Sequence, residues 1–388
     1  MSERHEALAC PHRPPCPGCP RFGEPGISQT ALAGLQALAR VHDLPGVPVV
    51  SGATHAFRLR ARLAIRGRQG APKLGMFQLG THRVVAIPHC VVQHPLINRV
   101  VAVVRRALVD AGVTPYSEAA HLGIARYLQV VVERSSQTAQ VVLVGNSPTA
   151  EPLATCLDLI RERLGDALHS LWFSAHCERS NAILGADFQN LCGPASVIER
   201  FGGAAIHYPP GAFGQSNLDV AEHIIGHVRD LVPEGARVTE FYAGVGAIGL
   251  SLLPGVRELR MNEVSPHSLQ GLELGLASLD AADRAKVTVV RGPAREVARA
   301  ASGADVIVAD PPRKGLDREL LEQLGEEPPG RFVYVSCGLE SFLEDTRYLT
   351  SRGGLRLRNL AAFNLMPFTE HVETVACFDH ARSHSTGH

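Results

Sequence analysis

Apolar and polar residues are spaced differently in the two halves of the chain. After a predicted amphipathic helix at residues 218–231, short apolar runs and helical stretches follow one another strictly. Strands are predicted near residues 236–242, 257–263, 286–291, 305–309 and 331–336, and helices near 247–254, 265–278, 293–301, 316–323 and 339–349. Such alternation predicts a doubly wound α/β sheet. The last apolar runs, 355–363 and 372–378, have no helix between them and predict a terminal antiparallel pair, followed by a polar tail at 379–388.

The first half mixes strands and helices without this regular alternation. Residues 57–65 alternate between apolar side chains and Arg58, Arg60 and Arg62, which predicts a half-buried strand with an arginine-lined outer face. Further strands are predicted at 74–77, 83–87, 127–133 and 140–144, and helices at 27–42, 96–111 and 153–164. The chain therefore divides into three predicted parts: an N-terminal segment (1–50), an α+β domain (51–205) and an α/β domain (206–388).

The charge distribution points to a polyanionic partner. The formal net charge is +0, yet no Asp or Glu lies between Asp43 and Asp110, whereas ten Arg and Lys residues do. A field of one sign is typical of a nucleic-acid-binding surface. The alternative is a basic patch that acidic residues from other parts of the chain offset in three dimensions.

Composition narrows the class of protein further. The 388 residues are 45% hydrophobic and 20% charged, which fits a globular protein of two or three domains. We expect no membrane span and no secretory signal, and hence a cytoplasmic protein with reduced thiols and no obligate protein partner evident.

Three of the nine cysteines lie close together in a loop rich in proline and glycine. They are Cys10, Cys16 and Cys19, and Cys90 is the candidate for a fourth ligand. A zinc ribbon would pair two Cys-x-x-Cys knuckles, and the second is missing. Three clustered cysteines with a remote fourth favour a [4Fe–4S] cluster, with zinc as the alternative.

A glycine-rich turn follows the predicted strand at 236–242. Gly244 and Gly246 would let the backbone approach a ligand closely, and Glu263 ends the next strand, where a carboxylate can accept both ribose hydroxyls of a nucleoside. With Gly249, the glycines fit the spacing Gly-x-Gly-x-x-Gly. This spacing fits NAD as well as S-adenosyl-L-methionine. Asp310, followed by two prolines at the end of a later strand, favours the methyl donor.

Cys337 ends a strand directly before a predicted helix, and Glu373 lies near the same end of the sheet. We expect the helix N-terminus to lower the pKa of the Cys337 thiol. A thiolate that adds to C6 of uracil makes C5 nucleophilic enough to accept a methyl group, and Glu373 would then remove the C5 proton. The alternatives are a buried structural thiol and a surface carboxylate.

Together these motifs resemble the uracil-C5 RNA methyltransferase family, particularly its iron–sulfur ribosomal RNA members. The resemblance covers nearly the whole chain and includes Phe213-x-Gln215-x-Asn217. It implies a Rossmann-like S-adenosyl-L-methionine methyltransferase domain, preceded by an α+β RNA-binding domain with an N-terminal iron–sulfur loop. It also implies a [4Fe–4S] cluster on Cys10, Cys16, Cys19 and Cys90. The implied donor-binding residues are Gln215, Tyr242, Gly244, Glu263 and Asp310, with Cys337 as nucleophile and Glu373 as proton acceptor.

The expected activity is methylation of C5 of a specific uridine, with 23S rRNA as the expected target and RNA binding resting on residues 58–106. The alternatives are a tRNA uridine-C5 methyltransferase, an NAD-dependent oxidoreductase and a non-catalytic iron–sulfur RNA-binding protein. Gly338-Leu339, Asn364, Phe368 and Gly292-Pro293 depart from the family pattern. These departures bear on turnover and substrate more than on the fold.

Overall fold

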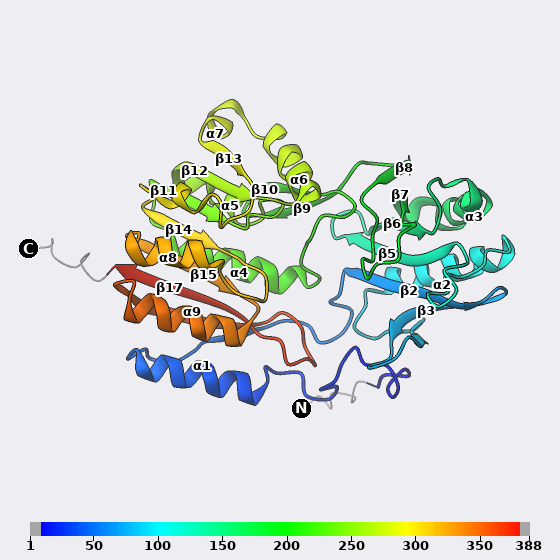
Figure 1. Ribbon diagram of the computed structural model, residues 1–388, viewed down its shortest axis with the longest axis horizontal. Helices are drawn as coiled ribbons and strands as arrows, with labels where there is room; N and C mark the ends of the chain where they lie inside the picture. Colours follow the sequence, from blue (N-terminus) through cyan, green and yellow to red (C-terminus); the bar gives the residue numbers. More distant parts are fainter. Residues whose placement is uncertain (1–8, 381–388) are drawn as a thin grey trace, which may run out of the picture.

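The computed structural model describes residues 9–380 and contains two large sheets that lie side by side (Figure 1). The C-terminal half builds an eight-stranded sheet in the order β1-β16-β17-β15-β14-β11-β12-β13. Its strands are β1 (Val49–Ser51), β11 (Ala236–Phe241), β12 (Val256–Glu263), β13 (Val287–Arg291), β14 (Val306–Ala309), β15 (Arg331–Ser336), β16 (Leu355–Asn364) and β17 (Glu373–His380). This is the α/β sheet that strand–helix alternation predicted.

The five strands from β11 to β15 are parallel, and β17 runs antiparallel to both β15 and β16. The terminal antiparallel pair is therefore confirmed. All four residues of β14 are buried, as expected for a parallel strand covered on both faces. The accompanying helices are α4 (Leu218–Leu231), α5 (Gly249–Leu252), α6 (Pro266–Ala277), α7 (Ala281–Ala285), α8 (Arg318–Glu326) and α9 (Leu339–Ser351).

The helix α1 (Gln29–Val41) also packs on this C-terminal sheet, below α9 in Figure 1. Its buried residue Leu35 belongs to the same apolar cluster as Phe342 of α9. The short strand β1 then pairs in parallel with β16. The helix α1 lies within the predicted segment 1–50, and β1 crosses its boundary by one residue. β1 was not predicted because three residues are too few to show a period.

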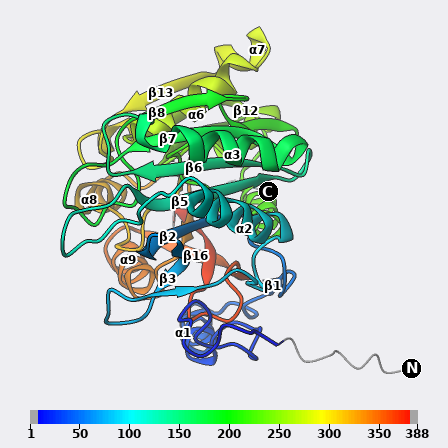
Figure 2. The same cartoon turned by 90° about the vertical axis from the view of Figure 1, so that its right-hand side faces the viewer.

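The second sheet has seven strands in the order β4-β3-β2-β5-β6-β7-β8. They are β2 (Arg60–Arg68), β3 (Ala71–Phe77), β4 (Val84–Ala86), β5 (Ala125–Glu133), β6 (Thr138–Gly145), β7 (Leu168–Ala175) and β8 (Phe188–Cys192). Two helices, α2 (Pro95–Asp110) and α3 (Ala154–Leu164), cover one face (Figure 2). A separate pair, β9 (Val197–Phe201) and β10 (Ala204–Tyr208), connects the two sheets along the chain.

Several predicted elements differ from the structure. Strands β7 to β10 were missed; β7 buries Ser170 and Ser174, so its sequence lacks a purely apolar face. The helix predicted at 293–301 is only a short 3₁₀ turn at Ala298–Ala301. The predicted tail begins too early, because β17 extends to His380, and residues 381–388 lie outside the described part. None of the helices between residues 9 and 380 has both the length and the apolar character that crossing a membrane requires.

Candidate active site

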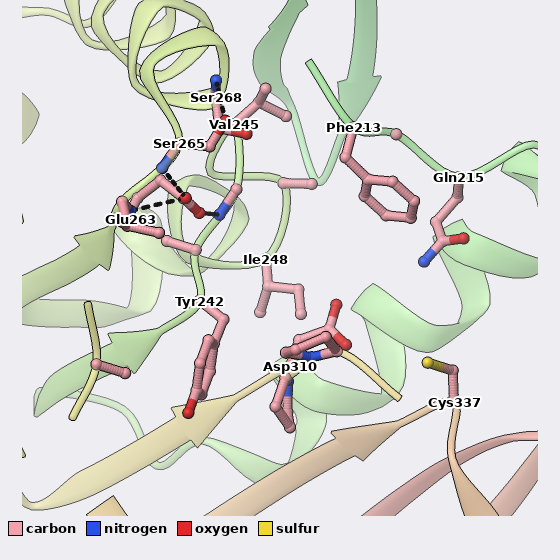
Figure 3. Close-up of a pocket in the computed structure, with 18 of the residues that line it drawn as sticks. Phe213, Gln215, Tyr242, Val245, Ile248, Glu263, Ser265, Ser268, Asp310 and Cys337 are labelled. Carbon is pink, nitrogen blue, oxygen red and sulfur yellow. Dashed lines mark hydrogen bonds between the residues drawn. The ribbon is translucent and has the colours of Figure 1, made fainter. Parts of the chain in front are cut away.

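A cavity of about 820 Å³ opens where β11, β12, β14 and β15 end. Its lining includes the seven residues that the family resemblance implied for donor binding and catalysis. These are Gln215, Tyr242, Gly244, Glu263, Asp310, Cys337 and Glu373. Figure 3 shows Glu263 at one end of the cavity, with Asp310, Gln215 and Cys337 towards the other. The tertiary structure thus brings the glycine-rich turn, the Cys337 thiol and the Glu373 carboxyl group together in one cavity.

Glu263 holds the glycine-rich turn in place. Its Oε2 accepts a hydrogen bond from the N–H of Gly244 at 2.7 Å, and its Oε1 accepts from the N–H groups of Val264 at 2.8 Å and Ser265 at 2.6 Å. Gly244 has a φ of 58°, a conformation that glycine adopts without strain. A carboxylate has about four acceptor positions. Three are occupied, so contact with both hydroxyls of a ribose requires one of these bonds to open.

Tyr242 connects this turn to the start of α8. Its hydroxyl accepts a hydrogen bond from the N–H of Asp317 at 3.0 Å and donates to Asp317 Oδ2 at 3.3 Å. Burial raises the pKa of Tyr242, so the phenol stays protonated and can donate. The backbone of Tyr242 has a φ of 61°, which is uncommon for a residue with a side chain. The two bonds to Asp317 help to hold this conformation.

Glu240 is a buried carboxyl that sequence reasoning missed. Burial raises its pKa well above the ordinary value, and the charges of Asp310 and Glu263 add to this effect. Its Oε2 has no hydrogen-bond partner among the described residues. A Cβ on Gly249 would lie 2.1 Å from this oxygen, so the third glycine of the motif makes room for the carboxyl. The available signal was an acidic residue inside an apolar strand, directly before the turn.

Cys337 lies half-buried between β15 and α9. Burial raises its pKa to about 11, with further contributions from the charges of Glu373 and Asp310. The prediction that the helix N-terminus lowers this pKa was wrong. Loss of hydration and two nearby carboxyl groups outweigh the favourable charge of Arg313.

The two carboxyl groups near the thiol also have raised pKa values. Burial raises the pKa of Asp310 to about 7. Burial, followed by the charge of Asp310, raises the pKa of Glu373 to about 8, and Arg313 opposes this shift. Glu373 is only 8% exposed. A cation in this cavity would favour the ionised form of each group.

Arg313 and His371 complete the wall around Glu373. An Arg313 Nη2 nitrogen lies 2.9 Å from Nε2 of His371, which accepts the hydrogen bond in its neutral form. Burial lowers the pKa of His371, and Arg313 lowers it further. Both residues belong to motifs that are recognisable in the sequence. Their contact could not be predicted, because 58 residues separate them along the chain.

The predicted cluster cysteines lie apart from this cavity. Among residues 9–380, no group of three or more His, Cys, Asp and Glu side chains is arranged to hold a metal ion. The thiols are nevertheless near one another. Burial raises the pKa of Cys19 to about 11, and the charges of Cys90, Cys16 and Cys10 add to it.

The arginines predicted to line an outer face mostly turn inward. The guanidinium of Arg60 stacks over the ring of Tyr208 at 4.2 Å, and Arg58 lies 3.6 Å from the sulfur of Met366. Among these three arginines, Arg62 alone is exposed. The predicted face is therefore wrong for Arg58 and Arg60, because the loops around the cavity cover this end of β2.

Acidic residues from outside the interval also neutralise part of the basic region. Arg66 forms an ion pair with Glu118, and Arg106 pairs with Asp110 at 3.0 Å. At Arg66 and Arg106, acidic residues from outside the interval therefore offset the positive charge, as the alternative to a nucleic-acid-binding surface expected.

Comparison with known proteins gives the family. The model of the tRNA (Uracil-5-)-methyltransferase family matches residues 200–380. A protein from Protochlamydia amoebophila, described as an uncharacterized RNA methyltransferase, is 34% identical over 383 residues, which cover 96% of this chain and 98% of that protein. A similarly described RNA methyltransferase from Halalkalibacterium halodurans is 28% identical over 82% of this chain and 69% of its own length.

Among solved structures, the tRNA (uracil-54, C5)-methyltransferase of Pyrococcus abyssi in complex with S-adenosyl-L-homocysteine has a similar fold. The TM-score is 0.74 at 22% identity, with 90% of this chain and 83% of that one covered. The family model and the 34%-identical relative define the chain as an RNA methyltransferase, and the fold agrees with this class. The chain belongs to the uracil-C5 RNA methyltransferase family. The alternatives of an NAD-dependent oxidoreductase and a non-catalytic RNA-binding protein are rejected.

Proposed function

We propose that this enzyme methylates C5 of a uridine in RNA through a temporary covalent bond between Cys337 Sγ and C6 of the base. The observation that carries the proposal is the single cavity that contains the glycine-rich turn, Cys337 and Glu373. A methyl donor at the turn and a uracil beside the thiol would share this space. The donor supplies an electrophilic methyl group on a positively charged sulfur.

The residues of the chain then act in order. The Cys337 thiolate adds to C6, and the displaced C5=C6 electrons form an enolate. Its C5 attacks the methyl carbon of the donor, and the methyl–sulfur bond breaks with its electron pair left on sulfur as a neutral thioether. The Glu373 carboxylate takes the C5 proton. The electrons of the C5–H bond re-form the C5=C6 double bond while the Sγ–C6 bond breaks, which returns the thiolate.

The charges in the cavity indicate that the donor binds before the thiol is activated. With pKa values of about 11 and about 8, Cys337 and Glu373 are mainly protonated at neutral pH in the protein alone. A cationic ligand in the same cavity favours the ionised forms of both. Donor binding is therefore expected to precede activation of the thiol.

The remaining predicted site residues are proposed to hold the donor. Gln215 and Asp310 line the cavity near Cys337, whereas Gly244 and Glu263 stand at the glycine-rich turn (Figure 3). Tyr242 also lines the cavity. The roles proposed for these five residues follow from their positions in the lining and from the chemistry of a nucleoside with a charged sulfur.

Incubation of the enzyme with RNA and methyl-labelled donor tests the activity. The expected product is 5-methyluridine, and label at any other position would contradict the proposal. We propose 23S rRNA as the target. A tRNA target is the second candidate, which the family description and the fold of the Pyrococcus abyssi enzyme favour. Mapping 5-methyluridine in both RNAs, with and without the gene, decides between them.

We also propose that Cys10, Cys16, Cys19 and Cys90 hold a [4Fe–4S] cluster. Neighbouring thiols that raise one another's pKa are a donor set that a metal centre would stabilise as thiolates. Protein purified without oxygen is expected to be brown and to contain about four irons per chain. A colourless, zinc-loaded protein would reject the cluster.

A further inference from the structure

The loop between β16 and β17 forms the wall of the cavity that leads to Glu373. Leu365, Met366 and His371 line the cavity, and Glu373 follows as the first residue of β17. On its other side this loop meets residues 20–26 of the N-terminal segment, drawn in dark blue in Figure 1. Two parts of the chain that are more than three hundred residues apart therefore share one wall of the site.

Arg21 makes most of these contacts. Its backbone N–H donates to the carbonyl oxygen of Phe368 at 2.9 Å, and its guanidinium donates to the carbonyl oxygen of Thr369 at 3.1 Å. The guanidinium also lies 3.6 Å from Glu370 Oε1 and donates to Glu24 Oε2 at 3.1 Å. The side chain is only 12% exposed. Arg21 thus ties the N-terminal segment to three successive residues of the loop.

Phe368 has a conformation that needs this support. Its φ of 66° lies in the left-handed region, which is strained for a bulky residue. The ring of Phe22 stands 5.0 Å from that of Phe368, and Phe57 and Val92 complete the apolar surroundings. Asn364 donates a further hydrogen bond to the carbonyl oxygen of Pro25 at 2.5 Å. The N-terminal segment therefore restrains both the start and the middle of the loop.

Thr369 carries the restraint towards the site. Its Oγ1 donates to the carbonyl oxygen of Met366 at 2.7 Å and accepts from the N–H of His371 at 3.2 Å. His371 in turn contacts Arg313 across the cavity wall at 2.9 Å. Displacing residues 368–369 would therefore move the backbone that leads directly into Glu373.

We propose that Arg21 is a positioning residue for removal of the C5 proton. Residues 20–26 act as a clamp on residues 364–371 and determine where the Glu373 carboxyl stands relative to the bound base. The inference rests on the proposed covalent mechanism, in which the C5 proton passes to Glu373 as the Sγ–C6 bond breaks. Glu263 and the glycine-rich turn lie at the other end of the cavity, so donor binding is expected to survive loss of the clamp (Figure 3).

Full-length Arg21→Ala and Arg21→Lys proteins test the clamp, with Arg40→Ala as the matched control. Arg40 is an exposed arginine in the last turn of α1. RNA carrying tritium at C5 of its uridines reports proton removal as tritium released to water. A protein–RNA band on a denaturing gel reports the covalent adduct.

Arg21→Ala is expected to slow tritium release about tenfold or more while the adduct fraction rises, because a misplaced base acts after the Sγ–C6 bond has formed. Its Kd for S-adenosyl-L-methionine should stay within about twofold of wild type. Arg21→Lys keeps the positive charge but loses the forked guanidinium donor. Its rate of tritium release should therefore lie between the rates of wild type and Arg21→Ala. Arg40→Ala should match wild type.

Equal losses of donor binding, adduct and tritium release in Arg21→Ala would overturn the clamp, as would behaviour identical to Arg40→Ala. If Arg21→Ala does not fold, Phe22→Leu tests the clamp in its place. Phe22→Leu is then expected to accumulate more adduct than wild type, and an unchanged adduct fraction would reject the clamp. A wild-type enzyme without any Cys337-dependent adduct would overturn the proposed mechanism and the clamp together. An adduct in wild type with unaffected Arg21 variants would reject the clamp alone.

Discussion

At the scale of single residues, the charges of Glu373 and Asp310 disfavour ionisation of the Cys337 thiol, and the charge of Asp310 also disfavours ionisation of Glu373. Burial comes first among the causes of the raised pKa values of Cys337, Asp310 and Glu373. A site built in this way keeps its nucleophile protonated until a positive charge arrives. Reactivity towards other electrophiles is thereby limited while no donor is bound.

Replacing the nucleophile should remove the chemistry and leave the fold intact. Cys337→Ala is expected to lower methylation by at least about 10³-fold and to abolish the denaturation-resistant RNA adduct. Cys177→Ala, at an exposed cysteine, is the control and should retain both. Labelled-methyl transfer and a denaturing gel measure the two quantities. Substantial methylation by Cys337→Ala would refute the covalent mechanism.

Replacing the base should trap the adduct and stabilise the protein at high pH. The folded-state pKa of Glu373 is about 8 against an ordinary value of 4.5, so the folded protein holds a proton that the unfolded chain releases. Stability conferred by this group is complete below about pH 4.5 and is lost as the pH rises through about 8. Glu373→Gln removes this titration, and the variant should gain about 4–5 kcal/mol over wild type at pH 8.5.

Urea unfolding of wild type and Glu373→Gln at pH 5 and pH 8.5 measures this difference in the free energy of unfolding. The gain should be small at pH 5, where the carboxyl is protonated in the folded state and partly so in the unfolded chain. The same variant should accumulate the RNA adduct without releasing C5 tritium. A gain that does not change with pH would argue against the raised pKa.

At the scale of elements, the reversed direction of β17 is what brings the base to the thiol. β14 and β15 deliver Asp310 and Cys337 after their last residues, at the carboxyl edge of the parallel sheet. Because β17 runs antiparallel, its beginning rather than its end lies at this edge, and Ser336 pairs with Thr374. Continuing this register by one position places Glu373 opposite Cys337, the proposed nucleophile.

The glycine-rich turn depends on the space that Gly249 leaves for Glu240. In Gly249→Ala the added Cβ would lie 2.1 Å from Glu240 Oε2, so the carboxyl or the helix start must shift. We expect a loss of about 2–4 kcal/mol in stability and weaker donor binding. Gly226→Ala in α4 is the control, since a Cβ there meets no heavy atom within 4 Å. Its effect should be neutral or slightly stabilising.

Thermal unfolding and donor titration of the two glycine variants measure these effects. An unchanged Kd for S-adenosyl-L-methionine in Gly249→Ala would show that the turn tolerates displacement of Glu240. The comparison with Gly226→Ala separates this steric effect from the general change in helix propensity.

At the scale of the whole molecule, the two sheets meet around the loop that carries Gln215. The N–H of Leu59, just before β2, donates to the carbonyl oxygen of Ser216 at 2.8 Å, and Arg60 packs on Tyr208 in the cavity lining. The proposed RNA-binding part is therefore in direct contact with the wall of the methylation site. RNA that lies along β2 would lead to the cavity.

This arrangement predicts different outcomes for two arginines of one strand. Arg62→Ala, at an exposed position, should weaken RNA binding and reduce the slope of log affinity against log salt by about 0.7–0.9. Arg66→Ala should instead lower the melting temperature, since it removes a buried guanidinium and its ion pair with the partly exposed Glu118. Filter binding over a range of salt concentrations, with Arg161→Ala on α3 as control, measures the slopes. An unchanged slope in Arg62→Ala would place the RNA elsewhere.

The sequence by itself determined where the parallel strands lie along the chain and that helices alternate with them. Burial on both faces leaves each of these strands as an uninterrupted apolar run between turn residues. It also placed Asp310 and Cys337 at strand ends, and its motifs indicated the family. These are local properties of the chain. The same local pattern could not show β1, or β7 with its buried serines, since their pairing depends on strands far away in the sequence.

The tertiary structure alone decided how charged groups behave once they are brought together. The pKa of Cys337 is raised rather than lowered because Glu373 and burial act on it together, and neither is visible in the helix that follows it. In the same way, Arg58 and Arg60 turn inward, and Arg21 holds a loop that is 348 residues away. Loss of hydration and contact between distant segments are properties of the folded chain, so no spacing along the sequence encodes them.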